Sequence, residues 1–201
     1  MVPDAVSTTL YAKGAKKWII DIDSSKSVVC FSTIKNLNFF QKCDAVLMDG
    51  TFSSCPSLFN QLFVVHGVKN SIYVPLFFCL LVGKSVTDYC TALKFLKQRS
   101  PQLTTTFHID FEQSIHSAVR LVWPMSKIKG CRFHLGQSWY RKIQSLGLSK
   151  VYSTEDEKGN FLKTFFGLLF LSPNEVDDCF TDDFMSTLPA DCYTRFYRLC
   201  F

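Results

Sequence analysis

Two aspartates of this chain stand where apolar, strand-like runs come to an end. Asp49 follows the run 45–48 in the stretch DAVLMDGTF, and Asp110 closes the threonine-rich stretch LTTTFHID. Because Gly50 follows Asp49 directly, the first stretch is typical of a buried strand that meets a tight turn. A carboxylate at a strand end is also a candidate ligand for Mg²⁺, which prefers oxygen ligands. Taken alone, the stretch favours the turn.

The two aspartates are stronger candidates as a pair. Strand ends that feed helices are where ligands gather in α/β domains, because backbone groups and side chains converge there. If their strands are neighbours, Asp49 and Asp110 form two close carboxylates whose mutual repulsion a divalent cation would relieve. The sequence therefore leaves two interpretations of Asp49 open, a turn residue and a metal ligand.

The elements that must position this pair follow an α/β order. Strands are expected at KSVVCFS, DAVLM, FNQLFVVHGVKN, SIYVPLFFCLL, LTTTFHID and KIKGCRFH. Helices are expected at TIKNLNFFQKC, at SVTDYCTALKFLKQR, over 111–122 and over 139–146, where Gly147 ends the last one. Asn70-Ser71 indicates an antiparallel pair, and Ser85 with Asp88 resembles a capping box. The expected fold is α/β, with a mixed sheet flanked by helices.

Composition narrows the class of protein. The chain has 201 residues, of which 47% are hydrophobic and 19% charged, so it can bury a core. Its longest apolar runs, 74–82 and 165–171, are far shorter than the roughly 20 residues of a membrane-spanning helix. Residues 1–14 lack the apolar block of a secretory signal. The nine cysteines show no regular framework and are read as reduced thiols, so we expect an intracellular protein with no membrane span.

Positive charge is concentrated in one stretch of the chain. No acidic residue occurs from Gln113 to Thr154, and the net charge of the whole chain is +5. The strongest candidates for nucleic-acid binding in that stretch are Lys127, Lys129, Arg132, Arg141 and Lys142. Phosphate contacts supply most non-specific nucleic-acid affinity, so the stretch fits a polyanion site as well as an ordinary solvated face.

Four ordered motifs together resemble the catalytic domain of Mutator-like element (MULE) transposases. They are DGTF (49–52), VPLFFCLLVGKS (74–85), IDFEQSIHSAV (109–119) and GCRFHLGQSWYRKIQSLGL (130–148). The resemblance implies a ribonuclease-H-like (RNase-H-like) core over 44–149. A strand and helix lead-in (1–43) would precede this core, and a partial helical insertion region (150–201) would follow it.

The same resemblance implies a chemistry. Members of this family cleave and transfer DNA strands with two aspartates, a glutamate and Mg²⁺ or Mn²⁺ ions. The aspartates correspond to Asp49, expected to bridge two metals about 3.5 to 4 Å apart, and to Asp110, expected on one of them. The family glutamate lies beyond the helical insertion and has no counterpart here, so we expect an incomplete copy. The resemblance also implies DNA as the partner and a nuclear location.

Several residues keep more than one interpretation. Cys131 and His134 match a cysteine and a histidine of the family, but two ligands fall short of the four of a structural zinc site, so packing and zinc binding both stay open. Glu112 is expected in the first helical turn, where it favours the helix dipole rather than serving as a third acid. The alternative function is a non-catalytic nucleic-acid-binding or interaction protein derived from a transposase. A homo-oligomer is compatible with either function.

Overall fold

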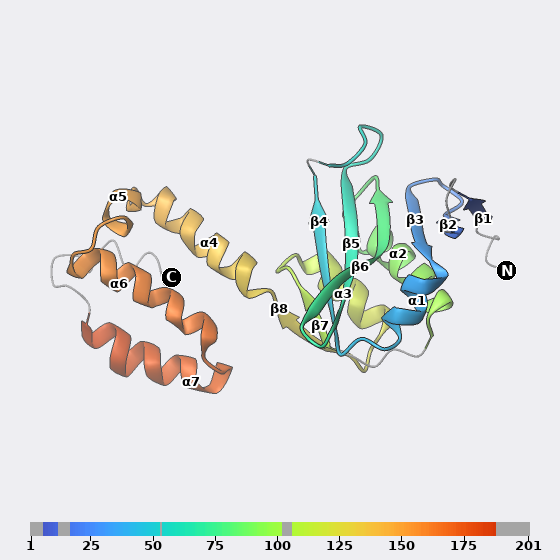
Figure 1. Ribbon diagram of the computed structural model, residues 1–201. Helices are drawn as coiled ribbons and strands as arrows, with labels where there is room; N and C mark the ends of the chain where they lie inside the picture. Colours follow the sequence, from blue (N-terminus) through green and yellow to red (C-terminus); the bar gives the residue numbers. More distant parts are fainter. Residues whose placement is uncertain (1–5, 12–16, 53, 102–105, 188–201) are drawn as a thin grey trace. The chain divides into compact units, whose positions relative to one another are not determined.

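The structure, a computed structural model, describes residues 6–11, 17–52, 54–101 and 106–187. The chain divides into two compact units, Met1–Cys131 and Arg132–Phe201, which Figure 1 shows in blue to yellow and in yellow to red. The family resemblance placed its boundary after residue 149. That boundary stays a prediction, because a compact unit and a family domain need not coincide.

The first unit contains an eight-stranded mixed sheet in the order β1-β2-β3-β6-β5-β4-β7-β8. The strands are β1 (Val6–Tyr11), β2 (Lys17–Ile22), β3 (Val28–Thr33), β4 (Ala45–Thr51), β5 (Gln61–Lys69), β6 (Ile72–Leu81), β7 (Thr106–Ile109) and β8 (Lys127–Gly130). The pairs β4–β7 and β7–β8 are parallel and the others are antiparallel. The predicted α/β fold with a mixed sheet is confirmed, and it agrees with an RNase-H-like fold. Strands β1 and β2 are additional to those predicted.

Helices α1 (Ile34–Phe40), α2 (Val86–Arg99) and α3 (Gln113–Val122) share one core with this sheet. Alternate residues of the central strands enter the core, as the period of two in a strand requires. On β4 these residues are Val46 and Met48, and on β7 they are Phe107 and Ile109. Residues 47 and 49, between and beyond the buried pair on β4, face away from it and are more exposed.

An ion pair joins the β2 strand to the end of α2. The buried carboxylate of Asp21 accepts hydrogen bonds from Arg99 Nη2 at 2.5 Å and Arg99 Nε at 3.2 Å. This contact raises the pKa of Arg99 above its usual value, chiefly through the hydrogen bond. Two bonds from one planar guanidinium fix the helix end against the strand.

Two local predictions are confirmed. Asn70 and Ser71 connect β5 to β6 with φ values of 50° and 62°, the positive values that a two-residue hairpin turn needs. Ser85 caps α2, and its side chain and that of Asp88 form a reciprocal capping box. The turn joins β5 and β6 into a hairpin, and the cap begins α2 shortly after β6 ends.

Three local predictions are wrong. The turn expected at Asp49-Gly50 is absent, because β4 continues to Thr51 alongside β5. KIKGCRFH is not one strand, since β8 ends at Gly130 and α4 begins at Arg132. Phe111 is 52% exposed and precedes α3 instead of lying on its buried face. For β4, the pairing with β5 and not the local pattern sets where the strand ends.

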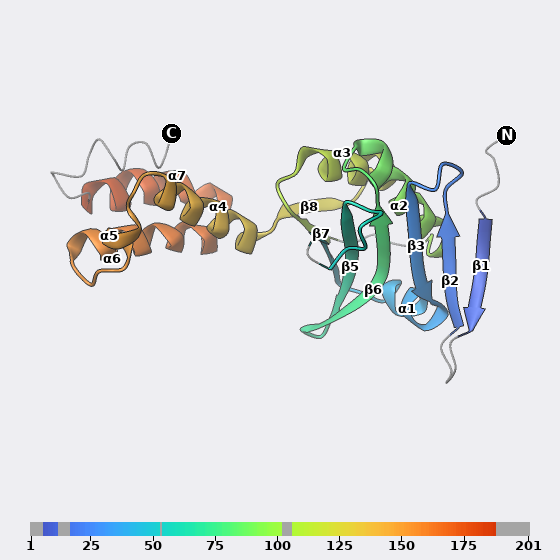
Figure 2. The same ribbon diagram turned by 90° about the horizontal axis from the view of Figure 1, so that it is seen from above.

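The second unit is helical (Figure 2). It contains α4 (Arg132–Ser145), α5 (Ser149–Tyr152), α6 (Glu157–Phe165), η1 (Phe166–Phe170), α7 (Pro173–Asp178), η2 (Cys179–Phe184) and η3 (Met185–Thr187). The predicted face of α4 is confirmed, since Ile143 is fully buried and the Trp139 ring lies 4.4 Å from that of Phe165. Gly147 follows α4 with a φ of 71°, a conformation that favours glycine.

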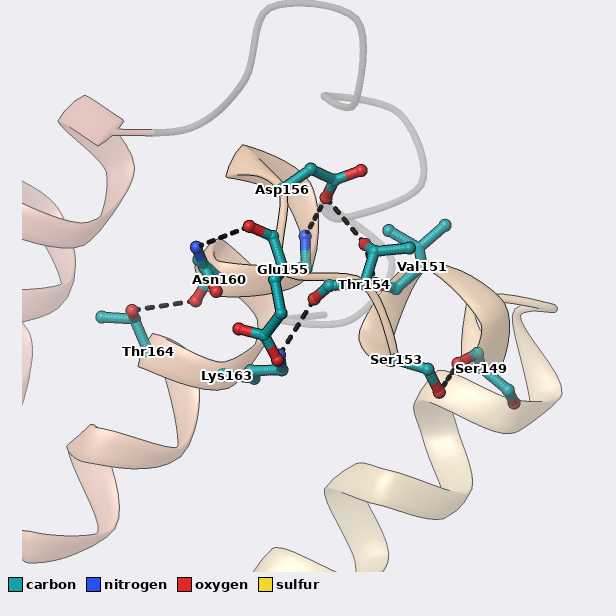
Figure 3. A network of polar contacts seen from close by, with 10 residues as sticks. Ser149, Val151, Ser153, Thr154, Glu155, Asp156, Asn160, Lys163 and Thr164 are labelled. Atoms are coloured by element: carbon teal, nitrogen blue, oxygen red, sulfur yellow. Dashed lines mark hydrogen bonds and ion pairs between the residues drawn. The ribbon is translucent and has the colours of Figure 1, made fainter.

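A network of polar contacts fixes the start of α6 (Figure 3). Asp156 Oδ1 accepts hydrogen bonds from Gly159 N at 2.9 Å and from Thr154 Oγ1 at 2.7 Å. These bonds lower the pKa of Asp156, that from Gly159 most strongly. Lys163 Nζ donates to Glu155 Oε1 at 2.7 Å and to Thr154 O at 2.9 Å. The network caps the helix and holds the α5–α6 connection against it.

Candidate metal and nucleic-acid site

Asp49 and Asp110 lie on neighbouring parallel strands or directly after them. The β4–β7 register pairs Ala45 with Thr106 and Leu47 with His108. Extending this register by two residues sets Asp49 level with Asp110. Neighbouring strands are about 4.8 Å apart, and residues level with one another point to the same face. The extended register therefore predicts that the two acids lie close together.

Each aspartate is oriented by its own backbone. Asp49 Oδ1 accepts a hydrogen bond from Gly50 N at 2.8 Å, and Asp110 Oδ1 accepts one from Phe111 N at 2.6 Å. The two carboxylates thus share one local arrangement. Pre-oriented carboxylates suit a metal site, because less side-chain freedom is lost when an ion binds.

The donor set fits a magnesium-like ion held by few protein ligands. Among the described residues, no group of three or more His, Cys, Asp or Glu side chains is arranged to hold a metal. Mg²⁺ keeps several waters and is commonly bound by one or two carboxylates together with substrate phosphates. Two carboxylates, from β4 and from the residue after β7, are compatible with that mode of binding. They are too few for a structural zinc site, which needs four protein ligands.

His66 on β5 is a neighbour of Asp49. It pairs with Leu47 on β4, two residues before the aspartate, and so lies on the same face. Burial lowers the pKa of His66 below its usual value, and the negative charge of Asp49 acts in the opposite direction. The Asp49 carboxylate is thus close enough to affect the pKa of His66.

A buried polar chain links Gly50, the residue after Asp49, to Glu112, the second residue after Asp110. A Cβ on Gly50 would lie 2.8 Å from Gln61 Oε1, so glycine allows the close approach of that amide. Gln61 Nε2 donates to Tyr89 Oη at 2.8 Å, and the Tyr89 hydroxyl is hydrogen-bonded to Glu112. Burial raises the pKa of Tyr89 well above its usual value, with further contributions from Glu112 and Asp110. Tyr89 therefore stays protonated and donates to Glu112.

The prediction for Glu112 is wrong in its details. This residue is the N-cap of α3, not part of its first turn, and its side chain makes no capping hydrogen bond. Its carboxylate is engaged by Tyr89 and lies 3.9 Å from Lys84 Nζ. Lys84 was not singled out from the sequence, although it precedes the Ser85 cap within the VPLFFCLLVGKS motif.

Cys131 and His134 fall in different units. Cys131 ends the first unit, and its backbone N–H donates to Ile109 O at 2.9 Å. His134 lies in the first turn of α4, with its ring edge-on to Phe133 at 5.5 Å. The two interpretations of the pair, packing and zinc binding, both stay predictions.

The basic residues are exposed but are split between the two units. Lys127 and Lys129 are at alternate positions of β8, which places them on one face of the strand. Arg132, Arg141 and Lys142 are exposed on α4. A nucleic-acid surface and a solvated face both stay predictions for these residues.

Comparison with known families identifies the part of the chain that runs from β4 into α4. Residues 45–138 match the MULE transposase domain. The chain carries a MULE transposase domain. The match begins with β4 and ends within α4, so it contains both aspartates, Glu112, Cys131 and His134. A search of curated proteins found no significant match to the chain.

The MULE domain supports a function related to transposition, and domains of this kind generally use divalent metal ions. In the described part of the chain, no helix is both long and apolar enough to cross a membrane.

Proposed function

We propose that this MULE domain binds Mg²⁺ or Mn²⁺ through Asp49 and Asp110 and uses the ion to hold a DNA phosphodiester. The observation that supports the proposal is the β4–β7 register, which, extended by two residues, would set Asp49 level with Asp110. Because DNA is the proposed ligand, we also infer a nuclear location.

The residues of the chain have separate tasks in this proposal. Asp49 and Asp110 bind the ion, while the N–H groups of Gly50 and Phe111 orient their carboxylates. The chemistry that a divalent ion supplies at such a site is stabilisation of the charge on phosphate oxygens. With Asp49 and Asp110 as its protein ligands, the site should hold one ion weakly, and strand cleavage should be undetectable.

The alternative is a transposase-derived protein that binds nucleic acid without catalysis. It draws on the exposed basic residues of β8 and α4, which would contact phosphates in any sequence. The first function requires metal binding at Asp49 and Asp110, whereas the alternative binds nucleic acid without it.

Calorimetric titration with Mn²⁺ tests the metal site directly. Asp49→Asn and Asp110→Asn should each weaken Mn²⁺ binding by at least about tenfold, since even residues that only support metal ligands have effects of this size. Asp44→Asn is the matched control, because Asp44 precedes the same strand and pairs with Lys69 at 2.6 Å. It should bind Mn²⁺ like the wild type.

A nicking assay on supercoiled plasmid, run beside the titration, tests the expected lack of cleavage. Mn²⁺ binding that is indifferent to Asp49 would overturn the metal site. Robust nicking that Asp49→Asn abolishes would instead show that a further residue completes the catalytic set.

A further inference from the structure

Lys84 contacts Phe52, directly after β4, and Glu112, the N-cap residue of α3. Its Nζ atom is 3.9 Å from Glu112 Oε2 and 3.9 Å from the centroid of the Phe52 ring. Phe52 follows Asp49 by three residues, and Glu112 follows Asp110 by two. The lysine comes from a third connection, between β6 and α2. One cation therefore contacts a residue that is close in sequence to each of the two acids.

The backbone on either side of Lys84 is fixed. Ser85 forms the N-cap of α2 with Asp88. A Cβ on Gly83 would lie 2.4 Å from Asp88 Oδ2, so only glycine fits at this point without displacing the capping carboxylate. The backbone position from which the Lys84 side chain extends is therefore fixed on both sides.

The position of Glu112 is fixed from the core. Its partner Tyr89 is 2% exposed, and Gln61, which donates to Tyr89, is 1% exposed. Buried polar groups of this kind keep their hydrogen bonds, because breaking one leaves a desolvated group unsatisfied. The carboxylate beside Lys84 is therefore anchored, and it can position the flexible lysine.

The lysine can still take a ligand. Its side chain is 42% exposed. Both of its contacts are longer than the roughly 2.7 to 2.9 Å of a charge-assisted hydrogen bond. An ammonium group held in this way can form a short bond to an incoming oxygen without breaking another. A phosphodiester approaching Asp49 and Asp110 would meet negative charge and would need such a cation.

We propose that Lys84 binds a non-bridging phosphodiester oxygen of DNA at the acid site and that Glu112, anchored by Tyr89, positions it. The inference deepens the proposed function and rests on it for the identity of the ligand. The exposed ring of Phe52 supports the lysine through a cation–π contact.

Fluorescence anisotropy with a labelled DNA duplex of arbitrary sequence tests the proposal, measured in Mn²⁺ over a series of salt concentrations. Lys84→Gln should weaken binding about tenfold and reduce the slope of log affinity against log salt by about one. Lys84→Arg keeps the charge and should restore most of both. Lys35→Gln removes an exposed lysine on α1 and is the matched control, with binding close to wild type.

Glu112→Gln separates phosphate binding from a purely structural ion pair. If Lys84 served only to pair with Glu112, both variants would lower the melting temperature and DNA affinity together. If Lys84 binds phosphate, Lys84→Gln reduces the salt slope, whereas Glu112→Gln keeps the lysine charge and therefore the salt slope, and lowers affinity only because the lysine is less well positioned. Unchanged affinity and salt slope in Lys84→Gln would overturn the inference. Failure of the proposed function would appear separately, as Mn²⁺ binding that is indifferent to Asp49.

Discussion

Gly50 serves the strand and the candidate site at the same time. It lies inside β4, its N–H orients the Asp49 carboxylate, and its missing side chain leaves room for Gln61. A glycine within a strand often marks such a close approach. In the pair Asp49-Gly50, the aspartate lies within a strand and the glycine makes room for the Gln61 amide. This explains the glycine without the turn that an Asp-Gly pair usually indicates.

Gly50→Ala should disturb the polar chain beneath the acids. The added Cβ would press on Gln61 Oε1 at 2.8 Å, displacing the amide that donates to Tyr89. We expect a loss of about 1 to 3 kcal/mol in the free energy of unfolding, as for overpacking, measured by urea denaturation. Gly167→Ala is the control, because a Cβ there meets nothing within 4 Å. Equal effects of the two variants would contradict the close approach.

At the scale of elements, β8 and α4 divide the basic residues. Lys127→Gln with Lys129→Gln removes the charges of the strand, and Arg141→Gln with Lys142→Gln removes two charges of the helix. Each lost phosphate contact should flatten the dependence of log affinity on log salt by about 0.9, so anisotropy titrations of the two double variants show which element contacts DNA. Lys94→Gln, an exposed lysine on α2, is the control. A salt slope that neither double variant changes would make the stretch an ordinary solvated face.

Elements that depend on local chemistry could be predicted from the sequence. The Asn70-Ser71 turn and the Ser85 cap need only residues within a few positions of one another. The end of β4 could not be predicted in this way, because pairing with β5 carries the strand past Gly50. The same limit explains Lys84 and Glu112, whose contacts join connections that are distant in sequence. For Asp49 and Asp110, the motifs identified the residues, and the parallel β4–β7 register, which predicts that they lie level, is known only from the fold.

At the scale of the whole molecule, the chain has two separate hydrophobic cores. The first contains Val28 to Trp123 and includes Leu93, while the second contains Ile143 to Phe184. Among the described residues, no buried side chain belongs to both clusters. Each unit therefore has its own source of stability, and the chain need not unfold in one step.

Single core truncations should accordingly act on one unit at a time. Leu93 and Ile143 are both 0% exposed, and each lies in a different core. Leu93→Ala should destabilise the first unit by about 2 to 5 kcal/mol, and Ile143→Ala should do the same to the second, because each leaves a cavity. Amide hydrogen exchange of the full chain measures both effects, since slowly exchanging amides report the opening free energy of their own unit. Protection in 17–131 should fall in the first variant and protection in 132–187 in the second. Equal loss in both ranges from either variant would show that the two cores unfold as one cooperative unit.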